Sequence, residues 1–217
     1  MTKVSNAMKT AAASGVAVVA AAVPAFAHHP MGGELPSTFI SGLLSGIGHP
    51  VIGFDHLAFI IAVGLASAFM ANRFIMPAIF VAATMVGCVL YSVGGIQLPM
   101  TEFAIAASVL VIGGLVMSGR EIAPAVFGML FAVAGLFHGS AYAGEILGAE
   151  ATPLAAYLMG FSLVQYAIAA VAIVVVREVW NATSSIAMQP RLAGAVVAGV
   201  GATFLIENME SVLFAAV

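Results

Sequence analysis

Long apolar segments recur along this chain of 217 residues and limit the structures that it can adopt. Several of them reach 18 residues, the length at which a helix can cross the hydrocarbon core of a membrane. The weaker alternation of about ten residues that is typical of membrane β-barrels does not occur. Charged residues make up 7% of the chain, whereas soluble domains carry roughly 25%. We therefore expect an all-α membrane protein.

The first 27 residues have the pattern of a cleavable secretory signal peptide. Lys3 and Lys9 precede an apolar core rich in alanine and valine, and Pro24-Ala25-Phe26-Ala27 resembles a small-x-small cleavage site. Cleavage after Ala27 is expected, and an uncleaved first helix is the alternative. Residues 28–217 would then form a single transmembrane domain. Its terminus, with His28 and His29, would either capture a divalent metal ion or be a solvated polar end.

Six transmembrane helices are expected, at about 38–72, 74–94, 101–118, 122–143, 153–176 and 191–214. The first would be about 52 Å long as one helix, which exceeds the ~30 Å hydrocarbon core. Pro50 removes a backbone donor, and Gly48 and Gly53 loosen the same turn. The sequence therefore predicts a break near residues 49–53, where irregular backbone is tolerated if it is buried in protein or lines a cavity.

The arginines predict how the helices are oriented in the membrane. If the mature N-terminus lies outside, successive crossings place all four on the cytoplasmic side: Arg73, Arg120, Arg177 and Arg191. This agrees with the positive-inside rule. The prediction is a multi-pass protein of the bacterial inner membrane, with both mature ends on the periplasmic side.

The first cluster of ionisable residues is His49, Asp55 and His56. Charged or ionisable groups within a membrane are costly unless they are paired or bind an ion, so they are candidates for function. The histidines are two helical turns apart and could share one wall. Imidazole and carboxylate groups suit nickel, cobalt or zinc. The alternative is a buried Asp55–histidine pair that only stabilises the break.

The second cluster lies at the outer end of the fourth span. His138, Tyr142 and Glu145 are spaced i, i+4 and i+7, which is one face of a helix if the helix continues through Gly144. The topology puts this cluster at the depth of the first one, so together they predict a metal or proton site. Glu207 in the last span is a possible additional member.

Other polar and small residues in the spans have simpler interpretations. Gln165, Thr84 and Ser108 are expected to form hydrogen bonds between helices rather than to bind an ion. The glycine pairs Gly42/Gly46 and Gly135/Gly139 predict close helix packing. The two histidine motifs lie in spans of opposite orientation, so an inverted repeat of three plus three spans is a further hypothesis.

At these residues the chain resembles the HupE/UreJ family of nickel/cobalt permeases. The resemblance rests on the run His49-Pro50-x-x-Gly53-x-Asp55-His56, on the later Phe137-His138-Gly139-x-Ala141, and on Glu145. Ser140 and Tyr142 stand where many members carry further histidines. The resemblance implies metal-handling roles for His49, Asp55, His56, His138 and Glu145, and a role in supplying nickel or cobalt to enzymes such as hydrogenase or urease.

These observations favour a secondary transporter that imports Ni²⁺ or Co²⁺ and holds no permanent cofactor. The chain has no nucleotide-binding motif, so an ion gradient, the membrane potential or trapping inside the cell would drive uptake. No cluster of basic residues indicates nucleic-acid binding. The alternatives are a membrane metalloenzyme, although no His-Glu-x-x-His helix is present, and a structural or accessory membrane subunit.

Overall fold

The structure is a computed structural model that describes residues 34–214, and within this range all regular secondary structure is helical. The α-helices are α2 (Phe39–Ile52), α3 (Phe54–Ser67), α4 (Ile75–Ser92), α5 (Thr101–Ser118), α6 (Pro124–Tyr142), α7 (Ala151–Val174) and α8 (Met188–Phe214). A 3₁₀ turn, η2 (Ala143–Ile146), follows α6, and a π turn, η3 (Val175–Val179), follows α7. The predicted all-α class is confirmed. The predicted signal peptide, His28 and His29 lie outside the described residues.

Five helices, α4 to α8, are long and apolar enough to cross a membrane. The bent pair of α2 and α3 makes a sixth crossing if it is counted as one span. This supports the predicted multi-pass membrane protein, and α5 has the same bounds as the predicted third span, 101–118. The last helix begins three residues before the predicted start at 191.

The break in the first span lies at Gly53, the last residue of the predicted range 49–53. α2 continues through Pro50 to Ile52. Pro50 lies in the last turn of α2, where its missing N–H removes only one intrahelical hydrogen bond. The chain leaves the helix at Gly53, whose ψ of 104° is extended, and α3 begins at Phe54 with an 80° change of direction. α3 ends at Ser67 rather than near residue 72.

The most extensive contacts join α2 to α7, α4 to α6 and α5 to α8. Each pair contains glycines whose hydrogen faces the partner's backbone, and a Cβ at these positions would overlap a backbone atom. Gly46 lies against the Tyr157 carbonyl, Gly139 against the Thr84 carbonyl and Gly113 against the Ala198 nitrogen. The close packing predicted for Gly42/Gly46 and Gly135/Gly139 is therefore confirmed.

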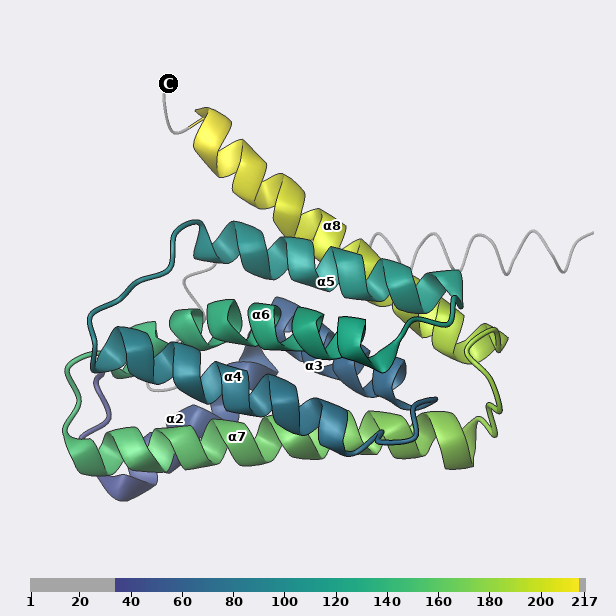
Figure 1. Ribbon diagram of the computed structural model, residues 1–217. Helices are drawn as coiled ribbons and strands as arrows, with labels where there is room; N and C mark the ends of the chain where they lie inside the picture. The colour runs from purple at the N-terminus through teal and green to yellow at the C-terminus, as the bar shows by residue number, and fades with distance from the viewer. Residues whose placement is uncertain (1–33, 215–217) are drawn as a thin grey trace, which may run out of the picture.

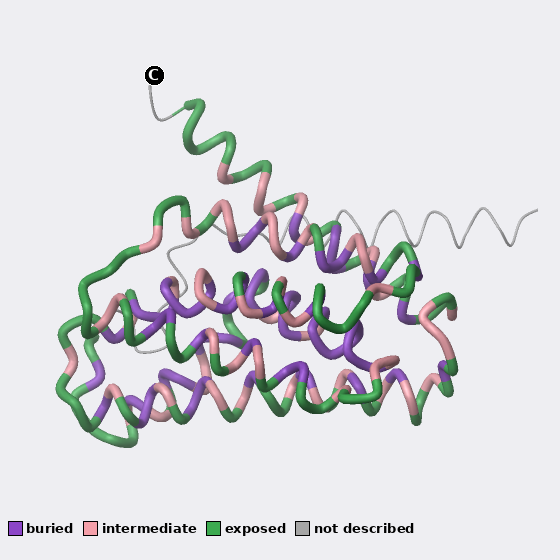
Figure 2. Tube along the Cα trace, viewed as in Figure 1, coloured by how far each residue is buried: buried purple, intermediate pink, exposed green. Residues whose placement is uncertain are grey.

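α3 lies inside the bundle and contacts all six of the other α-helices (Figure 1). Figure 2 shows its turns as mostly buried, which agrees with a helix surrounded by protein. The C-terminal half of α8 extends beyond the other helices and is largely exposed (Figures 1 and 2). Its apolar residues there, including Val212 and Phe214, are exposed, as expected for side chains that face lipid.

The connections fall at two ends of the bundle (Figure 1). Segments 93–100 and 143–150 lie at one end, and segments 68–74, 119–123 and 180–187 lie at the other. The four arginines belong to the second end, where Arg177 stacks on Phe69 and Arg191 donates a hydrogen bond to the Met117 carbonyl. The structure thus gathers the arginines at one end. The side of the membrane that they face stays a prediction.

Candidate metal-handling site

The break between α2 and α3 places His49 and His56 beside each other. His49 lies in the last turn of α2, and its carbonyl accepts a hydrogen bond from the Gly53 N–H at 3.1 Å. His56 lies in the first turn of α3, and the two imidazole centroids are 5.6 Å apart. A Cβ at Gly53 would lie 2.7 Å from Cδ2 of His56. Glycine is therefore needed at the break for the His56 ring to occupy this position.

α6 brings the third histidine to the same place. The His138 ring is fully buried, with its centroid 5.0 Å from that of His56. Tyr142, one turn further along α6, packs its ring 4.8 Å from His49 and 4.6 Å from His56. We call His49, His56, His138 and Tyr142 the histidine cluster. Two motifs that are more than 80 residues apart in sequence are thus in direct contact.

Hydrogen bonds determine which nitrogens of His138 and His56 carry protons. The Ser108 hydroxyl donates to the Ile105 carbonyl at 2.7 Å, so its oxygen accepts from Nε2–H of His138 at 3.1 Å. In the neutral ring the His138 Nδ1 is then an acceptor, and it lies 2.8 Å from Nδ1 of His56. His56 must donate through Nδ1. Its lone pair is therefore on Nε2, a nitrogen that can bind a metal ion.

A second set of hydrogen bonds orients His49. The Tyr157 hydroxyl on α7 donates to the Tyr142 carbonyl at 2.9 Å, so its oxygen accepts from Nδ1–H of His49 at 3.2 Å. Metal-binding histidines generally donate their other N–H to a protein acceptor in this way. Hydrogen-bond partners thus orient His49 and His56 as ligands and use both nitrogens of His138.

The spacing of the first two histidines fits one shared ion. Two imidazoles that bind the same ion through nitrogens at about 2.1 Å have ring centroids about 4.5–6.5 Å apart, depending on the angle at the metal. The separation of 5.6 Å between His49 and His56 lies inside this range. The buried hydroxyl of Tyr142, whose ring packs against both imidazoles, has no hydrogen-bond partner. An unpartnered buried hydroxyl on a residue that packs against two oriented imidazoles fits a polar occupant, such as a partly hydrated cation.

The acidic residues predicted for the site lie in different settings. Asp55 is buried, with 8% of its surface exposed, and accepts a hydrogen bond from the backbone N–H of His56 at 2.8 Å. It therefore holds the first turn of α3 on which His56 lies. Glu145 is half-buried in η2, because α6 ends at Tyr142 and the expected helical face does not continue. Glu207 is exposed on α8.

Within residues 34–214, no group of three or more His, Cys, Asp or Glu side chains is arranged to hold a metal ion. The cluster therefore offers two oriented imidazoles rather than a complete protein cage. Water would have to supply the remaining ligands of an ion bound there.

Tyr142 was predicted as a member of the second cluster, whereas the contact of Tyr157 with His49 was not predicted. Ser108 was expected to link helices, and it does so by bonding His138. Thr84 does not, because its hydroxyl donates to the Val81 carbonyl of its own helix. Gln165 does not either, since neither atom of its amide has a hydrogen-bond partner. No local pattern around Tyr157 marks it, because its contact with His49 joins positions 108 residues apart.

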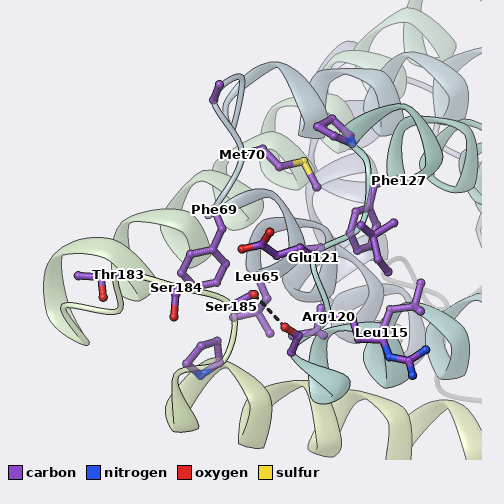
Figure 3. Close-up of a pocket in the computed structure, with 17 residues that line it drawn as sticks. Leu65, Phe69, Met70, Leu115, Arg120, Glu121, Phe127, Thr183, Ser184 and Ser185 are labelled. Carbon is purple, nitrogen blue, oxygen red and sulfur yellow. Dashed lines mark hydrogen bonds between the residues drawn. The ribbon is translucent and has the colours of Figure 1, made fainter.

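A pocket of about 360 Å³ opens at the other end of α3 (Figure 3). It lies where α3, α5, α6 and α8 end or begin, with Phe69 and Phe127 in its wall. Ser185 donates a hydrogen bond to the Gly119 carbonyl at its edge, at 2.9 Å. None of the predicted site residues lines this pocket. Fully buried apolar side chains, among them Phe59, Phe80 and Phe131, belong to the core beside and below the histidines.

Comparisons with known proteins agree with the motif resemblance. The family model described as HupE / UreJ protein matches residues 16–204. The protein HupE of Rhizobium leguminosarum bv. viciae is 34% identical over 131 residues, which cover 59% of this chain and 65% of the relative. The match thus spans slightly less than two thirds of that relative's length. No solved structure matches the chain.

Proposed function

The chain belongs to the HupE / UreJ family, and from this membership and the histidine cluster we propose that it is a permease for a divalent transition-metal ion. Ni²⁺ and Co²⁺ are the proposed substrates, because the motifs resemble those of nickel/cobalt permeases and because imidazole nitrogen suits these ions. Import would supply metal for enzymes such as hydrogenase or urease. The metal is cargo in this proposal, so no resident ion is needed for folding.

The observation that carries the proposal is the meeting of His49, His56 and His138 inside the bundle. The ring centroids of His49 and His56 are 5.6 Å apart, and those of His56 and His138 are 5.0 Å apart. His49 contacts the Tyr157 hydroxyl and His56 contacts His138, so each ring is oriented by a partner on another helix, as metal-binding histidines generally are.

The direction of transport follows from the predicted topology. With the arginine end in the cytoplasm, the histidine cluster would lie in the outer half of the membrane and the pocket of Figure 3 would open to the inside. The apolar core near Phe59 separates the two, which corresponds to a transporter closed on its inner side. An ion would bind from the periplasm, and a movement of the helices would be needed before its release.

Two other functions fit the observations less well. A membrane metalloenzyme would need a more complete metal cage, and residues 34–214 contain no group of three acidic, histidine or cysteine ligands. A structural subunit would explain the buried hydrogen bonds but gives no reason why three histidines from different helices meet. If the protein were only a structural subunit, substitutions in the histidine cluster would lower the yield of folded protein without a specific effect on metal uptake.

Uptake of ⁶³Ni²⁺ by cells that produce the protein tests the proposal. We expect saturable uptake by the wild type and at least a tenfold loss in His56→Ala at matched protein levels, because one of two imidazole ligands is removed. Excess Co²⁺ should compete with Ni²⁺ for uptake, and the same competition assay with Zn²⁺ and Cu²⁺ measures the selectivity. Uptake that is no higher than in cells lacking the protein would overturn the proposal, as would uptake that His56→Ala leaves unchanged.

A further inference from the structure

Gln165 is a fully buried side chain whose amide has no partner. Its relative exposure is 0%, and neither Oε1 nor Nε2 makes a hydrogen bond within the protein. An amide can accept two and donate two hydrogen bonds. Burying it without any of them is unfavourable, and such a group in a native structure calls for a missing partner such as water or an ion.

Two other fully buried polar side chains, at or beyond the level of the histidines, are satisfied by their own helices. Ser67 donates to the Val63 carbonyl at 2.6 Å, and Thr84 donates to the Val81 carbonyl at 2.8 Å. These hydroxyls therefore need no occupant. Among the described residues, Gln165 is the one side chain with two buried polar atoms that both lack a partner.

The position of Gln165 connects it to the histidine cluster. It belongs to a fully buried stripe on α7 at every fourth residue: Tyr157, Phe161, Gln165, Ala169 and Ile173. Tyr157 at the start of the stripe bonds His49. The packing of Gly64 of α3 against the Ala169 carbonyl shows that the stripe faces α3 further along. Gln165 thus lies between the level of the histidines and the inner half of α3.

The distance along the stripe is short enough for a stepwise transfer. Gln165 is eight residues beyond Tyr157, which is about 12 Å along the helix axis. The side chains around this level of α3 are apolar and fully buried, including Phe59 and Ile60. An ion that leaves the histidines for the inner pocket must cross this layer. The neutral amide of Gln165 is a polar group that can contact the ion within this layer.

We propose that Gln165 forms a second binding station for the transported cation, between the histidine cluster and the inner pocket. This inference rests on the proposed function. The amide oxygen binds the ion directly or accepts a hydrogen bond from its hydration water. An amide oxygen is a weaker ligand for nickel or cobalt than imidazole nitrogen, so the station lowers the barrier to passage without trapping the ion.

The test compares Gln165→Leu with the wild type in proteoliposomes. Leucine has a similar volume and removes only the polar atoms, so the melting temperature of the purified protein should stay the same or rise. We expect the maximal rate of ⁶³Ni²⁺ uptake to fall at least tenfold, while the Kd for Ni²⁺ measured by equilibrium dialysis changes less than twofold. Gln165→Ala provides a second variant if the Gln165→Leu protein is produced poorly, and the same loss of rate is expected.

Ser67→Ala is the matched control, because it removes a fully buried hydroxyl that its own helix already satisfies. Its uptake should stay within twofold of the wild type. Normal uptake by folded Gln165→Leu or Gln165→Ala protein would overturn the proposed binding station at Gln165. It would not contradict the proposal that the protein is a permease. An equal loss of uptake in Ser67→Ala would also overturn the station, because the effect would then not be specific to the unpartnered amide of Gln165. Absence of uptake by the wild type would overturn the permease, and the station with it.

Discussion

Each histidine of the cluster is oriented by a hydrogen-bond partner on another helix. His49 donates to Tyr157, and His56 donates to His138, which itself donates to Ser108. These contacts fix the directions in which the rings point. In the proposed site, the hydrogen-bond partners of His49 and His56 therefore contribute to metal affinity although they do not touch the ion.

Tyr157→Phe tests this positioning role. The substitution removes the hydroxyl that accepts from His49 and keeps the buried ring. Loss of such a partner typically lowers metal affinity 10- to 100-fold, so we expect the Kd for Ni²⁺ to rise by about tenfold or more. Isothermal titration of the purified protein with NiCl₂ measures this change.

Tyr166→Phe is the control on the same helix. The Tyr166 hydroxyl donates to the Phe74 carbonyl, away from the histidines, and the residue is exposed. Its removal should leave the Kd for Ni²⁺ unchanged. Equal affinities in Tyr157→Phe and wild-type protein would show that His49 needs no hydroxyl partner to bind the ion.

The histidines themselves could be predicted from the sequence, but their partners could not. Ionisable residues stand out in an apolar chain because they are costly to bury. Tyrosine and serine are common in membrane helices, and only the packing of α5 and α7 against α6 and α2 brings Ser108 and Tyr157 to the rings. The face expected to carry Glu145 required the helix to continue through Gly144, and in the structure a 3₁₀ turn rather than the α-helix carries Glu145.

At the scale of the elements, glycines set how closely helices approach. The small-xxx-small spacing predicted contact surfaces on α2 and α6, and these surfaces meet α7 and α4. The spacing did not identify the partners, since any helix with a matching surface can pack there. Pro50 and Gly53 predicted the break, but the exact residue depended on Gly53 taking an extended ψ of 104°.

Gly139→Ala tests the contact between α4 and α6. A Cβ there would overlap the Thr84 carbonyl, so the helices must separate next to His138. Overpacking of this kind costs about 1–3 kcal/mol, and we expect a lower melting temperature in detergent together with weaker Ni²⁺ binding. Circular dichroism during heating measures the first effect.

Gly128→Ala on the same helix is the control for Gly139→Ala. Its Cβ would lie 3.6 Å from Cδ1 of Ile79, an ordinary van der Waals distance. This variant should be as stable as the wild type or more so, because alanine favours the helix by up to about 1 kcal/mol over glycine. A melting temperature for Gly139→Ala equal to that of Gly128→Ala would contradict the tight α4–α6 contact.

For the whole molecule, several helix contacts between the hypothetical halves are symmetric, although the α3–α5 contact within the first half has no comparable α6–α8 contact among the described residues. If α2–α3, α4 and α5 correspond to α6, α7 and α8, exchanging the halves converts the α2–α7 contact into the α6–α4 contact. It also converts α3–α8 into α6–α5 and leaves α5–α8 unchanged, and all these contacts are present. The histidine cluster joins the first span of one half to the first span of the other, as in transporters whose site lies at the repeat interface.

The overall class and the approximate spans could be predicted because a membrane imposes simple rules on helix length and charge. The arginines gather at one end of the structure as the topology requires. The pocket of Figure 3 could not be predicted, because its wall combines the ends of four helices that are distant in sequence. Only the packed molecule shows that the histidine cluster and this pocket are separate.

X-ray absorption at the nickel K-edge of purified, nickel-loaded protein tests the histidine cluster most directly. We predict one bound Ni²⁺ with nitrogen and oxygen ligands at about 2.1 Å and outer-shell scattering from two imidazoles. His49→Ala and His56→Ala should each remove one imidazole from the spectrum. A spectrum without imidazole scattering, or one that neither substitution changes, would contradict binding of the ion between His49 and His56.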